Sequence, residues 1–206
     1  MNNKLLYINK TDKKESLDLY KVVIILLVTF FFSIFFSTIL NSSIETMAIS
    51  GTSMLETLQD NDYVILFKFS SYKRGDIIIF ESPATINNPY VTEYLVKRII
   101  ALPGDYIEVL RLGDRMVTKV NDVEIDEPYV TKSDTINYRE VKRTKLATGE
   151  FFYMGDNRID SYDSRAGNRM GTFSRDVIKG RVLLRYSMTK DENGKTKFDY
   201  EVFQRD

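Results

Sequence analysis

Histidine and cysteine are both absent from the 206 residues of this chain. Their absence excludes a Ser-His-Asp triad, a Cys-His protease and a zinc site of the usual His/Cys type. It also means that no disulfide framework supports the fold. Any serine that acts as a nucleophile here must be activated by another group, and a deprotonated lysine is the main candidate.

A net charge is absent as well, because 29 Lys and Arg residues balance 29 Asp and Glu residues. The chain therefore has no excess of positive charge that would suggest nucleic acid as a partner. Tyrosine and phenylalanine are frequent and often lie beside Val and Ile, which favours strands. Strand-like runs occur at 63–69, 76–81, 93–102, 151–156, 178–186 and 197–203, and Gly113-Asp114 predicts a hairpin. The predicted fold class is mainly β, with sheets packed on one another or partly closed as a barrel.

One long apolar run, VVIILLVTFFFSIFFSTIL at 22–40, carries no charge. As a helix it would measure about 28 Å, close to the roughly 30 Å hydrocarbon core of a bilayer. A buried helix of a soluble domain would usually show a polar stripe, and a cleaved signal peptide usually has a shorter apolar region. The run therefore predicts an uncleaved transmembrane anchor.

Flanking charge predicts the orientation of this anchor. The residues before it include Lys4, Lys10, Lys13, Lys14 and Lys21, whereas the first basic residue after it is Lys68. The positive-inside rule then gives a cytoplasmic tail at 1–21, the anchor at 22–40 and an extracytoplasmic domain at 41–206. We expect a single-pass protein of the cell membrane.

Lys97 interrupts an apolar stretch, EYLVKRIIAL. On a strand it shares one face with Leu95 and Ile99, while Arg98 points to the other face. A general base would need its pKa lowered from about 10.4 to about 7–8, and apolar burial can supply that shift. The alternative is a charge at a sheet edge that discourages aggregation.

Ser53 lies in the segment SGTSMLETL, two residues after Gly51. A glycine permits a tight turn that can aim backbone N–H groups at a developing oxyanion. An ordinary loop serine is the alternative.

The segment MGDNRIDSYDSRAGNRMG at 154–171 alternates acids with arginines, so Asp156/Arg158 and Asp163/Arg165 could form ion pairs. Its other interpretations are a solvated polar turn and a calcium loop. The spacing of an EF-hand is missing, so we expect no metal.

Four blocks together resemble the type I signal peptidases, which are membrane-anchored Ser-Lys proteases. They are GTSMLETL, RGDIIIF at 74–80, VKRIIALPGD at 96–105 and GDNRIDSYDSR at 155–165, in the family's order behind an anchor. The single anchor and compact size are similar to the Gram-positive type. The resemblance implies a β-rich protease domain with a membrane-facing apolar edge and no cofactor. Its substrates would be secretory preproteins that bind as an added strand, with small residues at positions −1 and −3.

The resemblance also implies roles for individual residues. Ser53 would be the nucleophile and Lys97 the general base, and the Ser53 N–H with a contribution near Gly51 would form the oxyanion hole. Ser161 would orient the Lys97 ammonium by a hydrogen bond. The pairs Asp156 with Arg98 and Asp163 with Arg165 would support the site.

Two positions depart from the family pattern. Glu56 replaces a proline, which loosens the turn after Ser53 and could bring a carboxylate near Lys97. Asn168 stands where a glycine is usual, which predicts a short insertion near the substrate cleft. Glu56 motivates an alternative function, a weakly active or inactive paralogue that helps to assemble one exported surface protein. A tethered β-domain without activity would require Ser53 and Lys97 to lie far apart.

Overall fold

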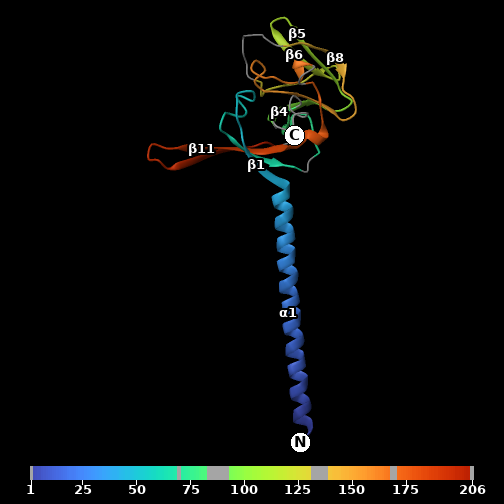
Figure 1. Cartoon of the computed structure of the whole chain (residues 1–206), viewed down its shortest axis with the longest axis vertical. Coiled ribbons are helices and arrows are strands. Elements are labelled where there is room, and N and C mark those ends of the chain that lie inside the picture. Colours follow the sequence, from blue (N-terminus) through green and yellow to red (C-terminus); the bar gives the residue numbers. More distant parts are fainter. Residues whose placement is uncertain (1, 69–70, 83–92, 131–138, 168–170, 205–206) are drawn as a thin grey trace. The chain divides into compact units, whose positions relative to one another are not determined.

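The computed structural model describes residues 2–68, 71–82, 93–130, 139–167 and 171–204, with side chains described from residue 19 onward. The chain divides into two compact units, residues 1–43 and 44–206. Its elements in chain order (Figure 1) are α1 (Asn2–Ser43), β1 (Ile44–Ala48), β2 (Tyr63–Phe67), β3 (Ile77–Glu81), β4 (Tyr94–Ala101), β5 (Tyr106–Leu112), β6 (Arg115–Val120), β7 (Val123–Glu124), β8 (Val141–Lys145), β9 (Glu150–Met154), the 3-10 turn η1 (Ser164–Ala166), β10 (Phe173–Ser174), a second 3-10 turn η2 (Arg175–Val177), β11 (Ile178–Lys190) and β12 (Thr196–Val202).

The first unit is the helix α1, which contains the apolar run. Its segment Leu19–Ser43 has 25 residues and a mean hydropathy of 2.7. At 1.5 Å per residue this segment is about 37 Å long, enough by length and composition to cross a bilayer. The helix ends at Ser43 rather than at Leu40, so the boundary predicted at residue 41 lies inside its last turn and the second unit begins at Ile44.

The second unit is built from two antiparallel sheets, and the mainly β fold class is confirmed. The larger sheet has the order β1-β2-β11-β3-β4-β9-β10, and β12 pairs with β11. The smaller sheet has the order β7-β6-β5-β8. The predicted hairpin is present, because Leu112 of β5 pairs with Arg115 of β6 across Gly113-Asp114. β1 and β8 are strands that the sequence did not predict.

β4 crosses the middle of the larger sheet between β3 and β9, and its second half is buried on both faces. Leu95 and Ile99, which share a face with Lys97, pack in an aromatic cluster with Phe80 and Tyr153. Ile100, on the opposite face, packs in a separate cluster that lies against β5 and β6. Lys97 is therefore in a fully covered part of the sheet, and the sheet-edge interpretation of this residue is wrong.

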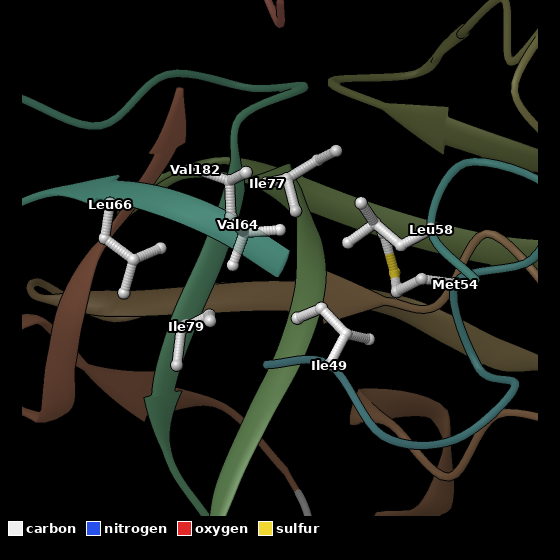
Figure 2. Close-up of a cluster of buried hydrophobic side chains, with 8 residues drawn as sticks. All are labelled: Ile49, Met54, Leu58, Val64, Leu66, Ile77, Ile79 and Val182. Atoms are coloured by element: carbon white, nitrogen blue, oxygen red, sulfur yellow. The ribbon is translucent and has the colours of Figure 1, made fainter. Parts of the chain in front are cut away.

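A third cluster anchors the loop that follows β1. Met54 and Leu58 from this loop are almost fully buried against side chains of β2, β3 and β11. Figure 2 shows the whole cluster, which consists of Ile49, Met54, Leu58, Val64, Leu66, Ile77, Ile79 and Val182. Because Met54 follows Ser53 directly, its burial fixes the serine at the boundary between the core and the surface.

Candidate active site

Ser53 and Lys97 meet in the folded chain. Lys97 Nζ lies 2.5 Å from Ser53 Oγ, which is within hydrogen-bonding distance. Ser53 comes from the loop after β1 and is half-buried, whereas Lys97 comes from β4 and is only 3% exposed. A tethered domain with the two residues far apart is therefore excluded. A hydroxyl this close to an amine can transfer its proton to that amine when the amine is neutral.

Burial lowers the pKa of Lys97 to about 8, because the charged ammonium loses its hydration inside the sheet. The negative charges of Asp163, Asp156 and Glu93 act in the opposite direction, while the positive charge of Arg165 lowers the pKa further. The desolvation effect is the largest of these. An appreciable fraction of the lysine is consequently neutral near neutral pH, as a general base requires.

Arg98, the neighbour of Lys97 on β4, points away from it and binds Asp156. Its Nε and Nη2 atoms donate to the two oxygens of Asp156 at 2.8 and 2.6 Å, and its Nη1 donates to the Gly75 carbonyl at 2.8 Å. The Thr57 hydroxyl also donates to Asp156 at 2.6 Å. The pair therefore ties β4 to both the segment after β9 and the loop that carries Ser53.

A second buried ion pair joins Asp163 and Arg165. The guanidinium donates twice to the carboxylate at 2.8 Å, and the Gly155 N–H donates to the same carboxylate at 3.1 Å. The ion pair between Asp156 and Arg158 that the sequence offered is not formed by their side chains. Arg158 instead binds Glu127 from the loop after β7, which the sequence did not predict.

The carboxylates of the 155–165 segment are thus occupied by protein donors. Asp156 and Asp163 bind arginines, and Asp160 accepts the Thr52 hydroxyl. Among the described residues, no group of three or more acidic side chains is arranged to hold a metal ion.

Gly51 and Ser161 differ from the roles that the resemblance implies. Gly51 has a φ of 98°, and its N–H donates to Asp60 Oδ1 at 2.8 Å, so this N–H does not point into an oxyanion hole. Ser161 Oγ is buried without a hydrogen-bond partner among the described residues, so the implied bond to Lys97 is not made.

Gly155 lies tightly between Ser161 and the main chain of Ser53. A Cβ atom at this position would lie 2.3 Å from Ser161 Oγ and 2.4 Å from the Ser53 carbonyl oxygen. Neither distance is tolerable for real atoms, so only glycine fits between the two segments. Gly155 was missed from the sequence although it opens the last of the four blocks.

A cavity of about 340 Å³ opens beside the two residues. Ser53 and Lys97 line it together with Met47, Ala48, Ile49, Ser50, Ile79, Glu93, Tyr94, Leu95 and Val96. Seven of these eleven lining residues are apolar or aromatic, and β1 is the terminal strand of its sheet. An extended peptide could therefore be added along this edge.

The sequence model of the family "Signal peptidase, peptidase S26" matches residues 17–187. The chain belongs to this signal peptidase family. It is 30% identical over 194 residues to signal peptidase I U of Bacillus subtilis, covering 89% of this chain and 94% of that protein. It is 35% identical to signal peptidase I P of Bacillus subtilis subsp. natto, covering 68% and 75%. A crystal structure of a signal peptidase I from Enterococcus faecalis is 27% identical, with coverage of 55% and 97% and a TM-score of 0.43.

Family membership makes this chain a serine protease. Two of its residues, Glu56 and Asn168, depart from the signal peptidase pattern. Glu56 is exposed, and it is not among the groups with the largest effect on the pKa of Lys97. The observation that motivated an inactive paralogue therefore gives that alternative no support. Asn168 lies outside the described residues.

Two further residues that contact the loop of Ser53 were missed from the sequence. Asn157 donates to the carbonyls of Thr52 and Ser53, and Asp160 accepts the Thr52 hydroxyl at 2.5 Å. Both residues belong to the last signal peptidase block. A polar motif indicates that a loop is held rigid, but it does not say which distant backbone atoms its side chains reach.

Proposed function

We propose that this signal peptidase removes signal peptides from exported preproteins with Ser53 as nucleophile and Lys97 as general base. The observation that carries the proposal is the 2.5 Å contact between Lys97 Nζ and Ser53 Oγ, made by a lysine that is 3% exposed. Chains without histidine have few other ways to activate a serine.

The reaction begins with a proton transfer from Ser53 Oγ to neutral Lys97 Nζ as the oxygen attacks the scissile carbonyl carbon. The resulting tetrahedral oxyanion is stabilised by the backbone N–H of Ser53. Lys97 then gives its proton to the leaving amine as the C–N bond breaks. The mature protein leaves, and the signal peptide remains as an ester on Ser53.

Hydrolysis of the ester repeats these steps with water. Lys97 removes a proton from the attacking water, and the same proton returns to Ser53 Oγ when the ester bond breaks. Between the two transfers Lys97 is a buried ammonium. Ser161 Oγ, which has no partner among the described residues, is available to accept a hydrogen bond from this ammonium.

The substrate binds along the edge of β1 with small side chains at positions −1 and −3. The cavity of about 340 Å³ beside Ser53, with Met47 and Ala48 of β1 in its lining, supports this binding mode. The Arg98–Asp156 and Asp163–Arg165 pairs support the site by fixing the segments that surround it.

α1 anchors the protein in the cell membrane, with a cytoplasmic N-terminal tail and the protease domain outside the cytoplasm. The lysines before the span and the absence of basic residues between Leu40 and Lys68 support this orientation. Preproteins present their cleavage sites on that side of the membrane after export.

We also propose that the hairpin of β11 and β12 contacts lipid. One of its faces carries Leu184, Tyr186 and Met188 paired with Val202, Tyr200 and Phe198. Met188, Phe198, Tyr200 and Val202 are each about half exposed or more, with Tyr200 at 69%. The other face carries charged and polar residues. β11 lies two strands from β1 in the larger sheet, and β1 follows the last helical residue Ser43 directly in the chain.

Cleavage of a preprotein by the full-length protein in detergent tests the proposed function. The substrate carries an Ala-x-Ala site, and the N-terminus of the product is sequenced. We expect cleavage directly after the second alanine by the wild-type protein and none by Ser53→Ala. Equal cleavage by both proteins would refute the role of Ser53.

A further inference from the structure

Asn157 contacts both peptide groups that flank the α-carbon of Ser53. Its side-chain Nδ2 donates to the carbonyl oxygen of Thr52 at 3.1 Å. Its backbone N–H donates to the carbonyl oxygen of Ser53, also at 3.1 Å. One residue of the segment after β9 therefore fixes the orientation of the peptide before the nucleophile and of the peptide after it.

The first of these contacts reaches the peptide that would supply the oxyanion donor. The Thr52 carbonyl and the Ser53 N–H belong to the same planar unit, so fixing the oxygen also fixes the direction of the N–H. A hydrogen bond accepted by the oxygen polarises the unit and strengthens its N–H as a donor. The Leu55 N–H adds a second bond to the same oxygen at 3.2 Å, while the Ser53 N–H donates to no atom of the described residues.

The amide of Asn157 is itself held in the required orientation. Its Oδ1 accepts the Asp160 N–H at 3.3 Å, which leaves Nδ2 directed at Thr52. The Asp160 carboxylate accepts the Thr52 hydroxyl at 2.5 Å. The segment that contains Asn157 and Asp160 therefore bonds both the main chain and the side chain of Thr52. The buried pair of Asp156 with Arg98 lies directly before Asn157 and anchors it.

We propose that Asn157 is a positioning residue that aims and strengthens the Ser53 N–H as the oxyanion donor. The proposal rests on the proposed function, since it assumes that Ser53 attacks a carbonyl. Asn157 touches no reacting atom, and its side chain reaches the loop of Ser53 only at the peptide between Thr52 and Ser53. Its contribution should therefore grow when the bound carbonyl becomes tetrahedral and negatively charged.

The affinities of two ligands for full-length Asn157→Ala distinguish this positioning role from a general loss of structure. A peptide boronate with alanine at its reactive end forms a tetrahedral adduct with a serine oxygen and fills the oxyanion hole. A reduced-amide peptide of the same sequence has no carbonyl oxygen at that position. We expect kcat/KM and boronate affinity to fall together by about 10- to 100-fold, part of the roughly 10²- to 10³-fold that losing an oxyanion donor costs. Reduced-amide affinity should change much less.

Thr52→Val is the matched control, because it removes a hydrogen bond between the same two segments but leaves the Thr52 carbonyl with its donors. It should not weaken the boronate selectively. Asn157→Asp serves as a second variant if Asn157→Ala does not fold, since it keeps the size and the backbone bond but cannot donate from its side chain. An equal loss of both ligands in the Asn157 variants, or a selective boronate loss in Thr52→Val, would overturn the proposal. Failure of the proposed function would instead show as cleavage by Ser53→Ala.

Discussion

Lys97 Nζ contacts Ser53 Oγ at 2.5 Å although the two residues are 44 positions apart in the chain. The contact depends on two separate features of the sequence. The apolar neighbours of Lys97 place it inside the sheet, and burial of Met54 holds the loop of Ser53 against that sheet. Removing either feature would separate the hydroxyl from the amine.

The burial of Lys97 should weaken the fold at neutral pH. Its pKa falls from 10.5 in the unfolded chain to about 8, which corresponds to about 3 kcal/mol of unfolding free energy lost below pH 8. The loss shrinks as the pH rises from 8 to 10.5, and above pH 10.5 the lysine is neutral in both the folded and the unfolded state. We expect Lys97→Met to be more stable than the wild type by about 1–3 kcal/mol at pH 7, measured by urea unfolding. A variant less stable at pH 7, or a difference that grows toward pH 10, would contradict the account.

The Arg98–Asp156 pair should be far more important for stability than an exposed pair of similar geometry. Asp156→Asn leaves the buried guanidinium without its counter-charge, which typically costs about 3–5 kcal/mol. Arg143 and Asp122 form an exposed pair at 2.7 Å, and Asp122→Asn should cost far less because solvent screens exposed charges. Denaturant melts of both variants test the contrast, and equal costs would show that burial is not the deciding factor.

The absence of tryptophan allows a direct test of the hairpin. Phe198→Trp places the sole tryptophan of the chain on the apolar face, where it can be excited selectively over the tyrosines, and Ser187→Trp places it on the polar face as the control. In vesicles with brominated lipids we expect strong quenching and a blue-shifted emission for the first variant only. Similar quenching of both fluorophores, or of neither, would contradict contact between this face and lipid.

Glu93 and Glu56 should affect the pH profile differently. The charge of Glu93 raises the pKa of Lys97, so Glu93→Gln should move the midpoint of the acid limb of kcat/KM to lower pH. Glu56 is exposed and not among the groups with the largest effect, so Glu56→Gln should leave the midpoint nearly unchanged. A larger shift for Glu56→Gln than for Glu93→Gln would mean that the Glu56 carboxylate approaches Lys97 in the working enzyme.

The strands that could be predicted from sequence are those with apolar runs, such as β3 and β4, because burial on both faces requires such runs. β1 was missed because its five residues, IETMA, alternate between exposed and half-buried and follow a long apolar helix. β8, with the sequence VKRTK, was missed because it is mostly exposed and its place in the sheet comes from pairing with β5.

The pairing of Ser53 with Lys97 could be predicted because histidine is absent and four ordered blocks resemble those of signal peptidases, whereas neither residue stands out by itself. The partners of their neighbours could not be predicted. Arg158 binds Glu127 and Gly51 donates to Asp60, and both contacts depend on how loops cross in space. Asn157 has no sequence feature that shows it would reach the carbonyls on both sides of Ser53.

The pH dependence of kcat/KM for the full-length protein tests the central claim most directly, namely that neutral Lys97 activates Ser53. The lysine is charged below its pKa of about 8, so activity should fall about tenfold for each pH unit below that value and level off above it. Lys97→Met should lack activity at every pH, with a loss of at least about 10³-fold. A flat profile from pH 6 to 9, or substantial cleavage by Lys97→Met, would contradict the account.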